Sequence, residues 1–107
     1  MADMTLLSDA LTAYVHDHTS PAHPIFLELR EETHANLDSP QMQVGRVEGA
    51  FLKLMVQLTG ARRILEVGTF SGYSGLSMAM ALPDDGRLLT CDVNPVATAI
   101  ARRYFDE

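Results

Sequence analysis

The sequence predicts an α/β fold in which short parallel strands alternate with helices, and three observations indicate this class. Two short apolar stretches, residues 63–67 and 88–93, have the length and composition of buried parallel strands. Helix-forming sequence lies between these stretches and again after the second one. The part of the chain before them carries helical patterns alone. We therefore expect a helical arm followed by the order strand, helix, strand, helix.

Three helices are predicted in the arm, over residues 5–17, 24–34 and 42–59. In each range the apolar side chains recur three or four positions apart, which is the spacing of one helix face. Pro24 suits the first turn of the second helix, and Phe26 and Leu29 are expected to point inward from it. Gly60 is expected to end the third helix, because glycine adopts the left-handed conformation that closes a helix.

The second half begins with the strand at 63–67 and continues with a helix over 71–82. The sequence PDDG at 83–86 predicts a turn into the second strand. Asn94 is expected to cap a last helix, which begins at Pro95 and runs towards the end of the chain. The first strand is apolar enough to be buried on both faces, as parallel strands are.

The predicted sheet is incomplete. Each strand–helix–strand unit takes about 30 residues, so a doubly wound sheet of six or seven strands would need roughly 200 residues. This chain has 107 residues and supplies two strands, both of which would be edges. We therefore expect the N-terminal half of a larger domain, or a domain completed by another chain.

Composition restricts the class of protein. A formal net charge of −6 and a pI near 5.0 disfavour binding to nucleic acid. The sequence shows neither the pattern of a secretory signal nor a membrane-spanning stretch, so we expect a cytoplasmic protein. Cys91 is the single cysteine, and its place in an apolar strand predicts a buried, inert thiol. The four histidines are spaced as solvated helix residues rather than as metal ligands.

A glycine-rich loop follows the first predicted strand, in the pattern Glu66-x-Gly68-x-x-x-Gly72-x-x-Gly75. A dinucleotide-binding loop would need a glycine at position 70, where this chain has Phe70. A Walker phosphate loop would need a lysine, which the loop lacks. Because both phosphate-binding signatures are missing, the loop suits a nucleoside ligand that carries no phosphate beside the glycines.

S-adenosylmethionine is a ligand of this kind. Asp92 ends the second strand about 20 residues after Gly72, where nucleoside-binding α/β folds place an acid that accepts ribose hydroxyls. N–H groups at the start of the following helix can meet the ligand carboxylate, and Glu66 can offset its ammonium or fix the loop. Taken alone, Glu66 also fits a solvated charge at a strand end, and Asp92 fits a residue that merely precedes a helix cap. The joint occurrence of both acids, the glycines and the helix start favours the cofactor site.

From residue 42 onward the chain resembles the first half of the cation-dependent class I O-methyltransferases, the family of catechol and caffeoyl-CoA O-methyltransferases. The motifs that carry the resemblance are QMQVG at 41–45, EVGTFSGYS at 66–74 and ALPDDGR at 81–87. It implies a Rossmann-like methyltransferase fold, of which residues 41–107 would form the first half of the S-adenosylmethionine-binding domain. Residues 1–40 are expected to form the helical N-terminal extension of the family, although they match it only loosely.

The resemblance implies a role in cofactor binding for nine residues. Met42 and Val44 would lie over the aminoacyl side, Phe70 would flank the cofactor, Asp92 would bind the ribose and Val93 would touch the adenine. The residues that would hold the methionine part are Glu66, Gly68, Thr69 and Ser74.

The remaining chemistry of this family lies in its second half. The resemblance implies a divalent cation such as Mg²⁺, a small aromatic acceptor with a catechol-like hydroxyl, and a homodimer. No residue of this chain matches the family's metal ligands or catalytic base. We therefore predict the cofactor-binding half of an O-methyltransferase, with no catalytic and no metal-binding residue of its own.

Two alternatives stay open. The chain is alternatively a non-catalytic fragment, or a half-domain that pairs the edge of its second strand with another chain. A nicotinamide-dependent oxidoreductase is the weaker alternative, because Phe70 replaces the first glycine of that fingerprint.

Overall fold

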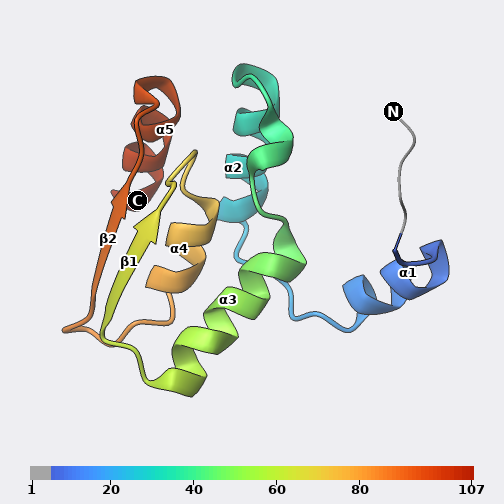
Figure 1. Cartoon of the computed structure of the whole chain (residues 1–107). Helices are drawn as coiled ribbons and strands as arrows, with labels where there is room; N and C mark the ends of the chain where they lie inside the picture. The colour runs from blue at the N-terminus through green and yellow to red at the C-terminus, as the bar shows by residue number, and fades with distance from the viewer. Residues whose placement is uncertain (1–5) are drawn as a thin grey trace.

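The computed structural model describes residues 6–107, which form a two-stranded sheet and six helical segments (Figure 1). In chain order these are α1 (Asp9–Asp17), α2 (Ile25–Asn36), the short 3-10 helix η1 (Pro40–Met42), α3 (Arg46–Thr59), β1 (Arg63–Val67), α4 (Tyr73–Ala79), β2 (Arg87–Cys91) and α5 (Pro95–Phe105). Strands and helices alternate from β1 onward, which confirms the predicted α/β class. Thr5, where the first helix was predicted to begin, lies outside the described residues.

Local residues explain where several helices begin and end. Ser8 caps α1, because its hydroxyl oxygen accepts a hydrogen bond from the Leu11 N–H at 3.2 Å. Gly60 closes α3 with a left-handed backbone of φ 62°, as predicted. Asn94 caps α5 through its side-chain oxygen, which accepts from two N–H groups of the first turn.

Four elements are shorter than predicted. α1 begins at Asp9 rather than at residue 5, since residues 6–8 are described and are not helical. α3 begins at Arg46 rather than at residue 42, because Gly45 keeps an extended backbone and η1 precedes it. α4 begins only at Tyr73, because Gly72 before it has a left-handed φ of 98°. β2 ends at Cys91, so the residues that follow it belong to a loop.

The two strands lie side by side in parallel, with Ile64 opposite Leu88. In Figure 1, α2, α3 and α4 all lie on one side of this sheet. Ile64 and Leu88 face that side and are half-buried, whereas Leu65 and Leu89 on the other face are 68% and 67% exposed. The prediction that both faces of β1 are buried is therefore wrong for the described residues, since none of them covers the second face. Cys91 lies on that open face and is exposed, so the prediction of a buried thiol is also wrong.

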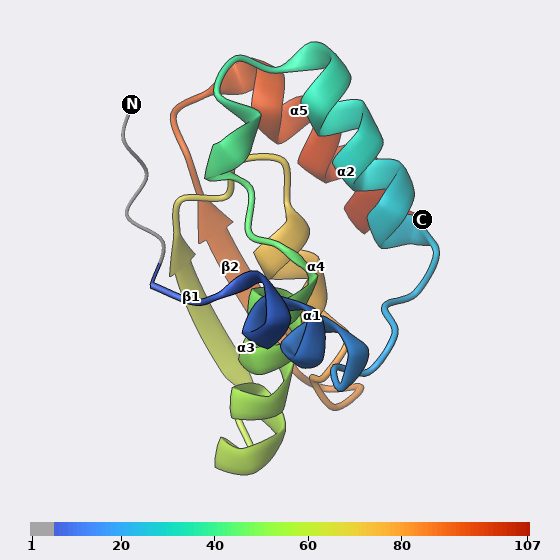
Figure 2. The ribbon, with the colours of Figure 1, turned by 90° about the vertical axis from the view of Figure 1, so that its right-hand side faces the viewer.

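The core lies among α2, α4 and α5, and Figure 2 shows α2 beside α5. Its buried members are Phe26, Leu29, Tyr73, Leu76, Ile100 and Tyr104. The Phe26 and Tyr73 rings pack with their centroids 4.8 Å apart. Phe26 and Leu29 point inward from α2, as predicted, so this helix of the arm shares its core with the helices that follow each strand.

α1 contributes no buried residue and joins the rest of the molecule mainly through Arg46 of α3. The Arg46 guanidinium donates hydrogen bonds to the carbonyl oxygens of His16 (2.6 Å) and Thr19 (3.0 Å). Of the helices described, none combines the length and the apolar composition needed to span a membrane.

Candidate cofactor site

The candidate site lies at the carboxyl ends of β1 and β2, which is where parallel α/β sheets bind their ligands. The loop after β1 passes through three left-handed backbone positions, at Gly68 (φ 104°), Phe70 (φ 48°) and Gly72 (φ 98°). Glycine adopts such angles readily, whereas a bulky side chain does so at a cost of about 1–3 kcal/mol. Phe70 thus takes a glycine-like conformation at the position where a dinucleotide loop has glycine, and the surrounding contacts must hold it there.

Asp92 supplies one of those contacts. Its Oδ2 accepts the Phe70 N–H at 2.8 Å, and its Oδ1 accepts the Asn94 N–H at 3.0 Å. These bonds, led by the one from Phe70, hold the pKa of the Asp92 carboxyl below its usual value. Each carboxylate oxygen keeps a second lone pair, so this exposed group can also accept hydroxyl groups of a ligand. Asp92 therefore does more than precede the cap at Asn94.

Glu66 supports the loop from the covered side of the sheet. Its carboxylate accepts hydrogen bonds from the hydroxyls of Ser74 and Thr90, the latter at 2.8 Å. The Thr90 Oγ1 also lies 2.6 Å from the Thr69 Oγ1, which connects the loop to β2. α4 comes so close that a β-carbon at Gly75 would lie 3.0 Å from the Glu66 Oε1. Glu66 is thus half-buried and fixes the loop, which excludes a freely solvated charge at the strand end.

The surface offered to a ligand is largely backbone. The Thr69 and Ser74 hydroxyls are both bound within the protein. Apart from Gly68 and its two neighbours in the chain, no described residue has an atom within 4 Å of the place where a β-carbon at Gly68 would be, so a ligand can approach the loop there. The first N–H groups of a helix have no partner inside it, and α4 begins at Tyr73, five residues after Gly68. Together with the Asp92 carboxylate, these groups fit a ligand that carries an aminoacyl group and a ribose.

The other three predicted residues differ in exposure. Met42 and Val93 are 66% and 98% exposed, whereas Val44 is half-buried against the core. Met42 and Val44 lie on the segment before α3, and Gln43 between them is hydrogen-bonded to Ser71 of the loop at 3.0 Å. The structure brings together, at the loop and the two strand ends, Glu66, Gly68, Thr69, Phe70, Ser74, Asp92 and Val93.

Sequence reasoning missed residues that hold the site in place. Thr90 is a polar residue in an apolar strand and pairs directly opposite Glu66, which is a signal that the strand alignment contains. Ser71, Thr33 and Gln43 form a hydrogen-bonded cluster behind the loop. Thr33 and Gln43 come from other segments of the chain. Gln43 stands in the QMQVG motif, but no pattern in the sequence indicated that it contacts Ser71.

A metal site does not form from the described residues. Within residues 6–107, no group of three or more His, Cys, Asp or Glu side chains is placed to hold a metal ion. The two acids of the site, Glu66 and Asp92, already bind hydroxyl and N–H groups. These residues therefore do not fit the divalent cation that the resemblance implies.

A cavity of about 540 Å³ lies away from the loop, between α3, α4 and the segment that follows α1. Its lining includes Phe26, Arg46 and Tyr73, but neither the loop glycines nor Asp92. The candidate cofactor site is instead an open surface at the strand ends, where Asp92 and Val93 are exposed.

Known proteins match this chain in sequence. Residues 16–107 match the family model described as O-methyltransferase. Caffeoyl-CoA O-methyltransferase 2 of Petunia hybrida is 44% identical over 91 residues, which cover 83% of this chain and 37% of that protein. Catechol O-methyltransferase of Niastella koreensis is 43% identical over 72 residues, which cover 67% of this chain and 33% of that protein.

Solved structures agree with these matches. An O-methyltransferase from Bacillus cereus, solved in complex with SAH, superposes with a TM-score of 0.80 at 36% identity and covers 91% of this chain and 44% of its own. The O-methyltransferase TomG from Streptomyces achromogenes, solved with SAM, superposes with a TM-score of 0.81 at 32% identity and covers 91% and 43%. The fold is thus that of Rossmann-like methyltransferases, and the chain spans less than half the length of these relatives.

Proposed function

This chain belongs to the O-methyltransferase family, and from that membership we propose that its protein is an S-adenosylmethionine-dependent O-methyltransferase. The chain carries the cofactor-binding half of that enzyme. The observation that supports this most is the hydrogen bond between the Phe70 N–H and Asp92, because it joins the loop after β1 to the acid at the end of β2. Relatives solved with SAM or SAH support the choice of cofactor.

In the proposed reaction, bound S-adenosylmethionine supplies the methyl group from its sulfonium. The contribution of this chain is to orient the cofactor, since alignment with the acceptor oxygen is what an in-line transfer requires. Asp92 accepts the ribose hydroxyls, and the open backbone at Gly68 and the start of α4 receive the aminoacyl carboxylate. Glu66 keeps the loop in place by binding Ser74.

The other predicted residues complete the proposed cofactor site. Phe70 flanks the cofactor and Val93, which is almost fully exposed, touches the adenine. Met42 and Val44 lie over the aminoacyl side. Thr69 contributes through its backbone, because its hydroxyl is turned towards Thr90.

The proposed acceptor is a hydroxyl of a small aromatic molecule, because the relatives are named caffeoyl-CoA and catechol O-methyltransferases. The net charge of −6 disfavours a nucleic-acid acceptor, because an acidic protein repels the phosphate backbone. A homodimer and a requirement for a divalent cation stay predictions from the resemblance. A cytoplasmic location stays a prediction from the sequence pattern.

A second candidate function rests on the open face of the sheet. Leu65, Val67 and Leu89 are exposed there, and exposed apolar groups of this kind mark surfaces that other segments cover. In this alternative the chain binds little cofactor alone and acts only when a further segment or chain completes the sheet.

Calorimetric titration with S-adenosylhomocysteine separates the two candidates. We expect the chain to bind in the micromolar range, and Asp92→Asn to weaken binding roughly tenfold to a hundredfold, since it removes a charged hydrogen-bond acceptor. Asp84→Asn makes the same change in an exposed turn and should bind as the unmodified chain does. If the unmodified chain releases no heat, the chain does not bind cofactor alone and the second candidate is favoured.

A further inference from the structure

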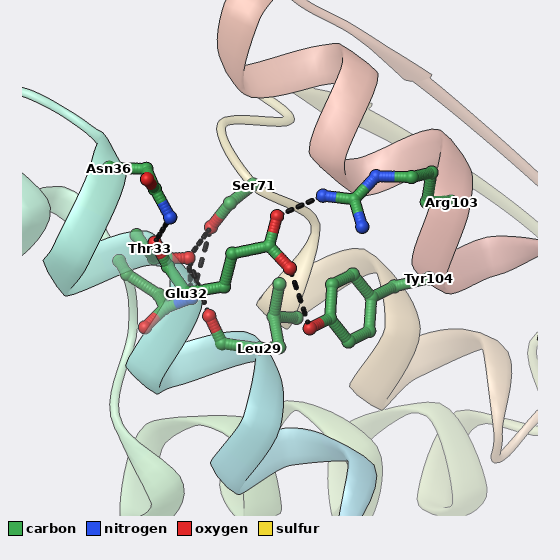
Figure 3. Close-up of polar contacts among 8 residues, drawn as sticks. Leu29, Glu32, Thr33, Asn36, Ser71, Arg103 and Tyr104 are labelled. Atoms are coloured by element: carbon green, nitrogen blue, oxygen red, sulfur yellow. Dashed lines mark hydrogen bonds and ion pairs between the residues drawn. The ribbon is translucent and has the colours of Figure 1, made fainter.

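Three polar side chains from separate segments meet in a buried cluster behind the glycine loop. Thr33 of α2 and Ser71 of the loop are both 0% exposed, and their hydroxyl oxygens lie 2.9 Å apart (Figure 3). Gln43, from the segment between η1 and α3, brings its Nε2 to 3.0 Å from each of these oxygens. We refer to these three residues as the Thr33–Gln43–Ser71 cluster.

The hydrogens in the cluster match the acceptors. The Gln43 amide carries two hydrogens, one for each hydroxyl oxygen. The Thr33 Oγ1 also lies 2.7 Å from the carbonyl oxygen of Leu29, one turn earlier in α2. The Thr33 and Ser71 hydroxyls carry one hydrogen each. These two hydrogens are enough for the two remaining contacts, from Thr33 to the Leu29 carbonyl and between Thr33 and Ser71. Because both hydroxyls are buried, removing the Gln43 amide leaves each of them with one partner fewer, at a place where a missing hydrogen bond is costly.

The cluster lies directly beside residues that are proposed to bind the cofactor. Gln43 stands between Met42 and Val44, and Ser71 follows Phe70. The cluster residues themselves are not among those assigned to the cofactor. Gln43 and Ser71 form their hydrogen bonds in the middle of these two segments. The cluster therefore holds both the segment with Met42 and Val44 and the loop with Phe70 in place relative to α2.

α2 is also bound to α5, which begins three residues after Asp92. Glu32 of α2 accepts a hydrogen bond from the Tyr104 hydroxyl at 3.0 Å and forms an ion pair with Arg103 (Figure 3). Glu32 and Thr33 are neighbours, so one turn of α2 holds both α5 and the glycine loop. The loop is thereby positioned from a helix of the N-terminal arm.

We propose that Gln43 and Thr33 are positioning residues, which set the conformation of the glycine loop through Ser71 and thereby the affinity for the cofactor. The part of this proposal that concerns affinity rests on the proposed function. The part that concerns the loop rests on the geometry alone.

Hydrogen exchange of single backbone amides, followed by NMR in the full chain, tests the loop directly. The reporters are the N–H groups of Phe70 and Gly72, which donate to Asp92 and to the carbonyl of Thr69. We expect Gln43→Leu to speed exchange at both by roughly tenfold, because two buried hydroxyls lose a donor. The N–H of Gly86, in the distant turn before β2, should exchange as before. The matched control Gln41→Leu makes the same change at an exposed position two residues away and should alter neither.

A second pair of variants keeps the test decisive if Gln43→Leu folds poorly. Thr33→Val removes the hydroxyl and should speed loop exchange, whereas Thr33→Ser keeps it and should restore slow exchange. Unchanged exchange at Phe70 and Gly72 in Gln43→Leu and Thr33→Val would overturn the proposal. An equal acceleration at Gly86 would also overturn it, because the cluster would then serve only overall stability.

Titration with S-adenosylhomocysteine tests the link to the cofactor. We expect Gln43→Leu to raise the Kd roughly tenfold and Gln41→Leu to leave it unchanged. Faster loop exchange with an unchanged Kd would refute the effect on affinity. If the unmodified chain binds no S-adenosylhomocysteine, the proposed function fails for this chain, and the exchange data still decide whether the cluster positions the loop.

Discussion

The two faces of the sheet are similarly apolar in sequence but differ in what packs against them. On the covered face, α4 lies so near that a β-carbon at Gly75 would be 3.3 Å from the Leu88 side chain. On the open face, Leu65 and Leu89 are 68% and 67% exposed. The polar groups that support the cofactor loop, Glu66 and Thr90, lie on the covered face. A helix layer on one side is therefore enough to build the loop, whereas burial of the strands requires two layers.

The largest expected effect comes from filling space on the covered side. Gly72→Ala would place a β-carbon 3.0 Å from the Ala101 side chain, at a backbone φ of 98°. Steric strain and overpacking together should lower the free energy of unfolding by about 2–4 kcal/mol, measured by chemical denaturation. Gly45→Ala is the matched control, because no described atom lies within 4 Å of its β-carbon and φ is −89°, and it should cost less than about 1 kcal/mol. Equal losses in the two variants would contradict close packing of α5 against the loop.

Neighbouring leucines of β2 compare the two faces directly. Leu88→Ala removes a side chain that packs against α4 and should cost about 2 kcal/mol in unfolding free energy. Leu89→Ala changes an exposed side chain on the open face and should cost less than about 0.5 kcal/mol. A loss at Leu89 as large as that at Leu88 would mean that another segment or chain covers the open face.

The contact between α2 and α5 should depend on alkaline pH. Burial first, and then the hydrogen bond to the Glu32 carboxylate, raise the pKa of Tyr104 from 10.0 to about 12. Its contribution to stability is therefore fully present below pH 10.0 and is lost as the pH rises through about 12. Tyr104→Phe should cost about 1 kcal/mol at neutral pH and should lack this loss when unfolding is measured across that range. Tyr14→Phe, at an exposed ring on α1, should keep the full pH dependence.

The smallest expected effect concerns Asp92 at the open end of the strands. Its lowered pKa means that the hydrogen bond from Phe70 is present above the ordinary value of 3.8 and is lost as the pH falls through the lowered value. In an NMR titration the Asp92 carboxyl carbon and the Phe70 amide proton should therefore change together, with a midpoint below 3.8. Separate midpoints for the two signals would show that the carboxylate does not hold the loop.

The elements that sequence predicted well depend on local patterns. β1 spans the predicted residues, because a short apolar run and Gly68 after it define both of its ends. Gly60 and Asn94 act where predicted, because a helix cap depends on one residue and its nearest neighbours. The acids and glycines of the candidate site were identifiable for the same reason, since their spacing follows two strand ends.

What sequence did not predict depends on contacts between distant residues. β2 ends before Asp92, whose carboxylate binds the N–H of Phe70 on the other strand's loop. The exposure of Cys91 depends on which layers are present, and its apolar neighbours alone indicate burial. Thr33 and Gln43 reach the loop from other segments, so neither their spacing nor the QMQVG motif that contains Gln43 indicates their contact with Ser71.

The hydrogen bond between Phe70 and Asp92 makes the end of one strand and the loop after the other a single thermodynamic unit. A ligand group can bind more tightly when this hydrogen bond is formed. Thermodynamic linkage then requires that its binding favours formation of the bond by the same factor. A ribose held by Asp92 and an aminoacyl group held along the loop would therefore raise each other's affinity without sharing a contact. Presented as two separate molecules, they should bind with positive cooperativity, and Asp92→Asn should abolish it.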